Sequence, residues 1–154
     1  MEVLQTIEQF GAVRLLKASF LAYPVVNALH IASIGALLTC VVLLDLRLLG
    51  AFRSLPRAAF MGLFRRLALA AFIAAALTGL ALFSVRASEY AATPVFLLKL
   101  GLIAAAMINF AVFSALCRQG DDGPAAGPVL RVSALASMLL WPAILLCGRF
   151  IGFL

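Results

Sequence analysis

Residues 20–44, FLAYPVVNALHIASIGALLTCVVLL, decide the fold, because they form an uncharged segment of 25 residues with few polar side chains. A helix of that length rises about 37 Å at 1.5 Å per residue. The hydrocarbon core of a bilayer is about 30 Å thick, so this helix is long enough to cross it. The segment is apolar on nearly every side, whereas a membrane β-strand alternates polar and apolar residues. The segment is therefore predicted to be a transmembrane helix.

Three further segments of the same character follow it, at residues 67–85, 94–117 and 129–148. The chain of 154 residues is 66% hydrophobic and only 12% charged. Soluble domains are about 45–50% apolar and about 25% charged, so the composition excludes an ordinary soluble domain. The sequence predicts an all-α integral membrane four-helix bundle, with residues 1–154 as a single transmembrane domain in a lipid bilayer.

The N-terminal residues 2–19 are too polar to span a membrane, yet their apolar residues recur at helical spacing. This pattern predicts a short helix lying in the membrane interface, and the alternative is a frayed terminus. One face of the expected helix carries Val3, Ile7 and Phe10, and the opposite face carries Glu2, Gln5, Glu8 and Gln9.

The distribution of arginines predicts the orientation of the spans. The connection between the first two spans carries five arginines, whereas the connection at residues 86–93 carries one. By the positive-inside rule, the arginine-rich connection faces the cytoplasm, and both termini lie outside a bacterial inner membrane. The Gly/Pro-rich connection at 118–128 is then a cytoplasmic turn. The net charge of +6 is explained by topology, so nucleic acid is not an expected partner.

Small residues predict which spans pack closely. Ala71, Ala75 and Gly79 are spaced four apart on the second span, and Gly101 and Ala105 have the same spacing on the third. Ridges of small residues let helix backbones approach one another in a membrane. We therefore expect spans 67–85 and 94–117 to be neighbours.

Ionisable residues within membrane spans are costly and point to functional sites. His30 is the only histidine of the chain, and Asn27 lies one turn before it on the same helical face. Lys99 is expected at a similar depth, and Arg149 lies at the same outer rim. A neutral imidazole can ligate iron or copper, and cations at its level can hold carboxylates such as haem propionates. The alternatives are that His30 only hydrogen-bonds a neighbouring helix and that Lys99 extends outward to water.

Asp45 lies at the inner end of the first span, beside the arginine-rich connection. The separation of fifteen residues from His30 corresponds to a rise of about 22 Å, so the two side chains are too far apart to act together. We expect Asp45 to form an ion pair with one of the nearby arginines.

The first span and its C-terminal end resemble a group of uncharacterised four-span bacterial inner-membrane proteins. The shared residues are Tyr23 and Pro24, His30, Gly35 and the segment Asp45-Leu-Arg-Leu-Leu-Gly50. This resemblance covers most of the chain and implies the four-span fold, but it implies no activity.

A more distant resemblance is to the superfamily of the CopD copper-resistance proteins and the HemJ-type protoporphyrinogen oxidases. HemJ-type proteins carry a histidine on the first span, an Arg-Leu opening and a later glycine on the second, and a lysine near the start of the third. The matching residues here are His30, Arg66 and Leu67, Thr78 and Gly79, and Lys99 and Leu100. In that family the histidine and lysine are required and b-type haem is bound, so the resemblance implies haem at His30 and Lys99. Asn109 departs from the pattern, because another polar residue or a histidine is usual there.

Three functions follow as hypotheses. The first is a haem- or porphyrin-associated membrane protein, with or without redox enzyme activity, in which His30 is the axial ligand and Lys99 or Arg149 lies near carboxylates. The second is a CopD-like copper-handling protein with His30 as metal ligand. The third is an accessory subunit without a cofactor or chemistry of its own, working in a larger membrane complex. A single histidine excludes bis-histidine ligation within one chain, so a homodimer is one expected way to share a haem.

Overall fold

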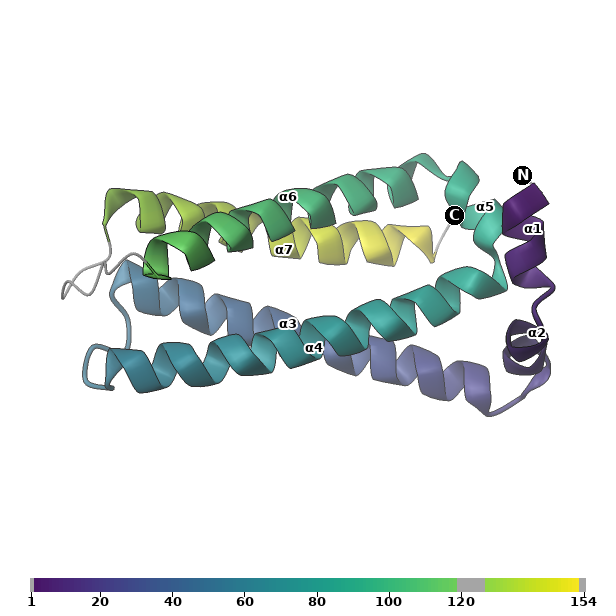
Figure 1. Ribbon diagram of the computed structural model, residues 1–154, viewed down its shortest axis with the longest axis horizontal. Helices are drawn as coiled ribbons and strands as arrows, with labels where there is room; N and C mark the ends of the chain where they lie inside the picture. The colour runs from purple at the N-terminus through teal and green to yellow at the C-terminus, as the bar shows by residue number, and fades with distance from the viewer. Residues whose placement is uncertain (1, 119–126, 153–154) are drawn as a thin grey trace.

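The computed structural model describes residues 2–118 and 127–152, and all of its regular elements are helices. This part of the chain confirms the predicted all-α architecture with long apolar helices and a short N-terminal helical region (Figure 1). The turn predicted at 118–128 falls largely outside the described residues. The elements in chain order are α1 (Glu2–Glu8), α2 (Gly11–Ala18), α3 (Ala22–Leu49), α4 (Arg57–Val85), α5 (Ala87–Ala92), α6 (Pro94–Arg118) and α7 (Pro128–Ile151).

Four helices, α3, α4, α6 and α7, are long and apolar enough to cross a membrane. The helix α4 has 29 residues and begins at Arg57, ten residues before the span expected at 67–85. Its length of about 43 Å exceeds the apolar core of a bilayer. Arg57, Arg65 and Arg66 therefore lie on the first turns of a helix and not in a loop, and the connection itself is reduced to residues 50–56.

The last residues of the segment 45–50 fix the conformation of the connection between α3 and α4. Gly50 ends α3 with a φ of 107°, a left-handed conformation that favours glycine. The Arg47 guanidinium donates hydrogen bonds to the carbonyl oxygens of Ala51, at 3.1 Å, and Leu55, at 2.9 Å. Arg47 thus holds both ends of the short connection through backbone groups.

The long helices form two antiparallel pairs, α3 with α4 and α6 with α7, and the pairs meet mainly through α3 and α7 (Figure 1). This arrangement corrects the expected neighbourhood of spans 67–85 and 94–117. In the described residues, no Cα atom of α4 lies within 8 Å of a Cα atom of α6. The small residues of α4 instead serve its contact with α3, as the position of Gly79 shows below.

The apolar core lies near the end of the bundle that carries the α3–α4 connection. All five buried residues of α3 fall in its C-terminal half, between Leu37 and Leu48. They pack against residues of all three other long helices, including Ala68, Phe113 and Leu130. The N-terminal half of α3, which carries His30, contains no buried residue. The half of the bundle away from the α3–α4 connection is therefore less enclosed than the half beside it; following the predicted orientation, we name these the outer and the inner half.

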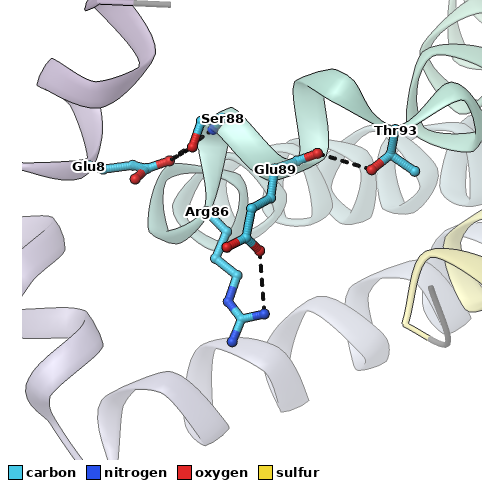
Figure 2. A network of polar contacts seen from close by, with 5 residues as sticks. All are labelled: Glu8, Arg86, Ser88, Glu89 and Thr93. Atoms are coloured by element: carbon cyan, nitrogen blue, oxygen red, sulfur yellow. Dashed lines mark hydrogen bonds and ion pairs between the residues drawn. The ribbon is translucent and has the colours of Figure 1, made fainter.

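The N-terminal region forms two short helices instead of the single one expected, with a break at Gln9 and Phe10. The helix α1 contacts α5, the short helix between α4 and α6, at the end of the bundle where both termini lie (Figure 1). The Glu8 carboxylate accepts hydrogen bonds from the Ser88 backbone N–H, at 2.8 Å, and from the Ser88 hydroxyl, at 2.6 Å (Figure 2). Glu8 thus links the N-terminal region to the start of α5.

These bonds make the attachment of α1 dependent on pH. Ser88 hydrogen-bonds the charged form of the Glu8 carboxyl and so lowers its pKa below the usual value. A lowered pKa means that the stabilisation is present above the ordinary pKa of a glutamate and is lost as the pH falls through the lowered value. We expect the Ser88 amide to lose its protection from deuterium exchange, measured relative to the intrinsic rate at each pH, when the pH falls below the ordinary pKa of a glutamate. Glu8→Gln should show weaker protection of this amide already at neutral pH.

The matched control for this prediction is Gln5→Ala, which alters an exposed side chain of the same helix. It should leave the exchange of the Ser88 amide unchanged. An exchange rate in Glu8→Gln equal to that of the wild type would show that the carboxylate does not hold α1 in place.

Candidate functional site

His30 lies half-buried between α3 and α4, and its ring has a defined hydrogen-bonding role. Its Nδ1 atom is 2.9 Å from the Thr78 hydroxyl. That hydroxyl has one proton, which it donates to the Ala74 carbonyl oxygen at 2.6 Å. Nδ1 is therefore the donor to Thr78, and a neutral His30 keeps an unprotonated Nε2 with its lone pair. This is the tautomer in which histidine ligates a metal through Nε2.

Gly79, next to Thr78, makes room for the His30 ring. A Cβ atom built on Gly79 would lie 2.9 Å from Cε1 of His30, closer than real Cβ contacts allow. The sequence identified Gly79 as part of a contact with the third span, whereas the structure assigns it to the contact between α4 and the histidine of α3. The absence of a side chain at this position allows the imidazole to reach the α4 backbone.

Lys99 occupies a similar position in the other helix pair. Its Nζ atom would be 3.2 Å from a Cβ atom built on Gly148 of α7, and the neighbouring Cys147 lies within electrostatic range. Lys99 is half-buried, and within the described residues no oxygen acceptor hydrogen-bonds its ammonium. Burying a charge without a partner is costly, so an anionic group beside this ammonium would stabilise it.

The structure brings His30 and Lys99 within electrostatic range of each other, although they belong to different helix pairs. The other two residues predicted for this site lie at exposed positions of their helices. Asn27 is exposed on α3, one turn closer to the outer end than His30. Arg149 is exposed on the last turn of α7. The candidate outer site therefore consists of His30, with Thr78 as its positioning residue, and Lys99.

The outer rim beside this site is formed by α5 and its neighbours. Arg86 and Glu89 form an ion pair at 3.4 Å in which both side chains are mostly exposed (Figure 2). Phe83, Tyr90 and Phe96 stack on one another with ring centroids 5.2 to 6.4 Å apart. Burial in this stack raises the pKa of the Tyr90 hydroxyl. These rings connect α4, α5 and α6 at the end of the bundle.

A second polar cluster lies in the inner half of the bundle, and it corrects the expectation for Asp45. The Asp45 carboxyl pairs with no arginine in the part of the chain that the structure describes; it is buried, with 5% of its surface exposed, and accepts a hydrogen bond from the Ser137 hydroxyl of α7. Beside it, Asn109 of α6 and Ser133 of α7 exchange two hydrogen bonds, one of 2.9 Å between their side chains and one of 3.0 Å to the Ser133 carbonyl. These four residues line a cavity of about 60 Å³.

Sequence reasoning missed this inner cluster, because Asp45 was assigned to the membrane surface. A signal was available in the spacing of Ser133 and Ser137, which lie four residues apart on one face of the fourth span. Such a polar face on an apolar helix favours a position inside the bundle, where other helices offer polar partners. Within the described residues, no group of three or more His, Cys, Asp or Glu side chains could hold a metal ion at either site.

The role of Gly79 can be tested by stability. Gly79→Ala places a methyl group against the His30 ring, which has to shift together with α3. Such overpacking typically costs about 1–3 kcal/mol. We expect Gly79→Ala to lower the midpoint of thermal unfolding in detergent. Gly101→Ala is the control, because a Cβ atom there has no other side chain or helix within 4 Å, and it should be neutral or stabilising. Equal midpoints for the two variants would contradict the close contact.

Comparisons with known proteins give no match to the chain among family models, curated proteins or solved structures. The resemblance to HemJ-type and CopD proteins thus rests on the motifs quoted above. The function has to be argued from the geometry of the two polar clusters.

Proposed function

We propose that this chain is a haem- or porphyrin-associated protein of a bacterial inner membrane, which binds b-type haem through His30 in the outer half of the bundle. The observation that carries the proposal is the hydrogen bond between Nδ1 of His30 and the Thr78 hydroxyl, which leaves the lone pair of the neutral ring on Nε2. A histidine that ligates a metal usually donates its other N–H in this way. The ring also approaches the α4 backbone at the Ala75 carbonyl and at Gly79, so ligation through Nε2 requires the ring to turn its Nε2 edge toward the cofactor. The haem, when bound, supplies one-electron redox chemistry.

The remaining residues of the outer site fit the anionic edge of such a cofactor. Lys99 offers an ammonium without an oxygen acceptor, within electrostatic range of His30, and a haem propionate is an acceptor of matching charge. Thr78 fixes the orientation of the imidazole. Asn27 and Arg149 are exposed near the outer end and remain candidates for contact with the propionates.

The single histidine limits the iron coordination that the chain can provide. One chain supplies one imidazole, so an iron held by His30 would be completed by a ligand other than histidine or by a second His30 from another copy in a homodimer, or would keep an open position. Copper fits less well, because the described residues offer no cluster of His, Cys, Asp and Glu around His30.

The orientation of the site follows from the charges at the opposite end of the bundle. Arg47, Arg57, Arg65 and Arg66 all lie near the α3–α4 connection. The positive-inside rule assigns that end to the cytoplasm, so the proposal places His30 and Lys99 in the outer leaflet and both termini outside.

An absorption spectrum of the purified protein tests the proposal. Wild-type protein from cells supplied with a haem precursor should show a Soret band with about one haem per chain or per dimer. His30→Ala should lose the band, and added imidazole should restore it if the fold is intact. Thr78→Val should lower the haem content because the imidazole is no longer held in its orientation. Lys99→Met should lower it because the positive charge that faces the propionates is removed.

Ser33→Ala is the matched control, because the Ser33 hydroxyl lies one turn from His30 and donates only to the Leu29 carbonyl of its own helix. Its spectrum should equal that of the wild type. A wild-type protein without a Soret band, or a band of equal intensity in His30→Ala, would contradict the proposal. One equivalent of copper that depends on His30 would instead favour the copper-handling function.

A further inference from the structure

We infer that Asp45 is a proton-binding group in a small hydrated cavity of the inner half of the bundle. This site is separate from the proposed haem site, and its existence does not depend on a haem. The inference rests on the burial of the carboxyl, the lack of a partner for one of its oxygens, and the cavity that this residue lines.

The Asp45 carboxyl is the most deeply buried acidic group of the described residues, with 5% of its surface exposed. One interaction links it to Ser137, but its Oδ2 atom has no hydrogen-bond partner. An ionised carboxylate without a cation is very costly in an apolar interior, and such groups are neutralised instead. The carboxyl therefore needs a cation partner or a proton.

Arg47 and Arg65 direct their hydrogen bonds away from Asp45. Arg47, two residues further along α3, projects about 200° around the helix from it and donates through its two terminal nitrogens to Ala51 and Leu55, while its buried Nε has no hydrogen-bond partner. Arg65 of α4 donates to Ser114 and lies over the rings of Phe110 and Phe113.

The other groups packed around this region do not supply a cation either. Arg131, the charged residue of α7 at this end, is exposed. Lys99 of α6 lies ten residues before Asn109, a rise of about 15 Å. Among the described residues, a further titratable group of this region is the Cys40 thiol of α3, which is buried in the apolar core and carries no positive charge. A proton is thus the cation that the surroundings of Asp45 accommodate.

The cavity provides the water that a proton site requires. Its volume is about 60 Å³. Roughly 10–15 Å³ of such volume is enough for one water molecule, so there is space for a few. Its walls are mostly apolar, but the polar residues among them, Asp45, Asn109, Ser133 and Ser137, offer hydrogen bonds to water. Oδ2 of Asp45 is covered in this structure, and a small rotation of the carboxyl toward the cavity brings this oxygen to such a water.

The site is close to the end of the bundle at which protons can enter. Asp45 lies five residues before Gly50, a rise of about 7.5 Å along α3. A hydronium ion arriving from that side gives its proton to the carboxylate, which leaves a water molecule and a neutral carboxylic acid. The reverse transfer to water restores the carboxylate.

Infrared spectroscopy of the full chain tests this inference. The chain has three aspartates, Asp45, Asp121 and Asp122, so the double variant Asp121→Asn with Asp122→Asn leaves Asp45 as the only one. Labelling the aspartate carboxyl with ¹³C then reports on Asp45 alone. We expect the band of a protonated carboxylic acid near neutral pH, and a shift of this band in D₂O because the proton exchanges through the cavity.

Adding Asp45→Asn to this background should remove the labelled band altogether. The assignment does not depend on that variant folding, because the label already isolates Asp45. A carboxylate band alone, from mildly acidic to mildly alkaline pH, would overturn the inference by showing a permanently ionised group. A protonated band that does not shift in D₂O would also overturn it, because the site would then be closed to water.

Discussion

A bilayer core offers no hydrogen-bond partners, and this constraint governs where every polar side chain of the bundle lies. The simplest solution is a bond within one helix, and the Ser33 and Thr39 hydroxyls each donate to a carbonyl four residues earlier. The next is a bond between helices, as His30 makes with Thr78 and Asn109 makes with Ser133. These contacts tie α3 to α4 and α6 to α7, the two pairs of which the fold is built.

Glycine at two helix contacts makes the outer arrangement possible. His30 lies against Gly79, and the Lys99 ammonium lies against Gly148, each on the other helix of its pair. A side chain at Gly79 would collide with a stiff ring, whereas one at Gly148 would meet only the end of a flexible chain. The histidine is therefore held more rigidly than the lysine, which suits a ligand fixed by its surroundings and a cation that adapts to an anion.

The spans could be predicted from the sequence, because their length and apolarity follow from the thickness of the bilayer. Their pairing could not, because alanine is spread so evenly that Ala71 and Ala75 fit several neighbours equally well. The start of α4 was also misplaced, since arginines such as Arg57 and Arg65 favour helix as readily as an interfacial loop. His30 and Lys99 were found because polar residues are rare in the spans, but their partners, Thr78 and the two glycines, required the structure.

The two polar clusters differ in how clearly their residue types mark them in the sequence. The outer cluster joins groups whose residue types already point to ligand binding, and the histidine is unique in the chain. The inner cluster joins an aspartate, an asparagine and two serines from three helices, and none of these is conspicuous alone. Only the helix pairing, with α3 against α7, turns Asp45 from a surface group into a buried one.

The proposed role of His30 as a haem ligand depends on its tautomer, because a ring protonated at Nδ1 keeps the lone pair on Nε2. ¹⁵N NMR of the cofactor-free protein measures this tautomer directly. The chain has one histidine, so imidazole labelling gives a single pair of resonances without a need for assignment. We predict a neutral ring, protonated at Nδ1 and unprotonated at Nε2. A proton found at Nε2, or at both nitrogens near neutral pH, would contradict it.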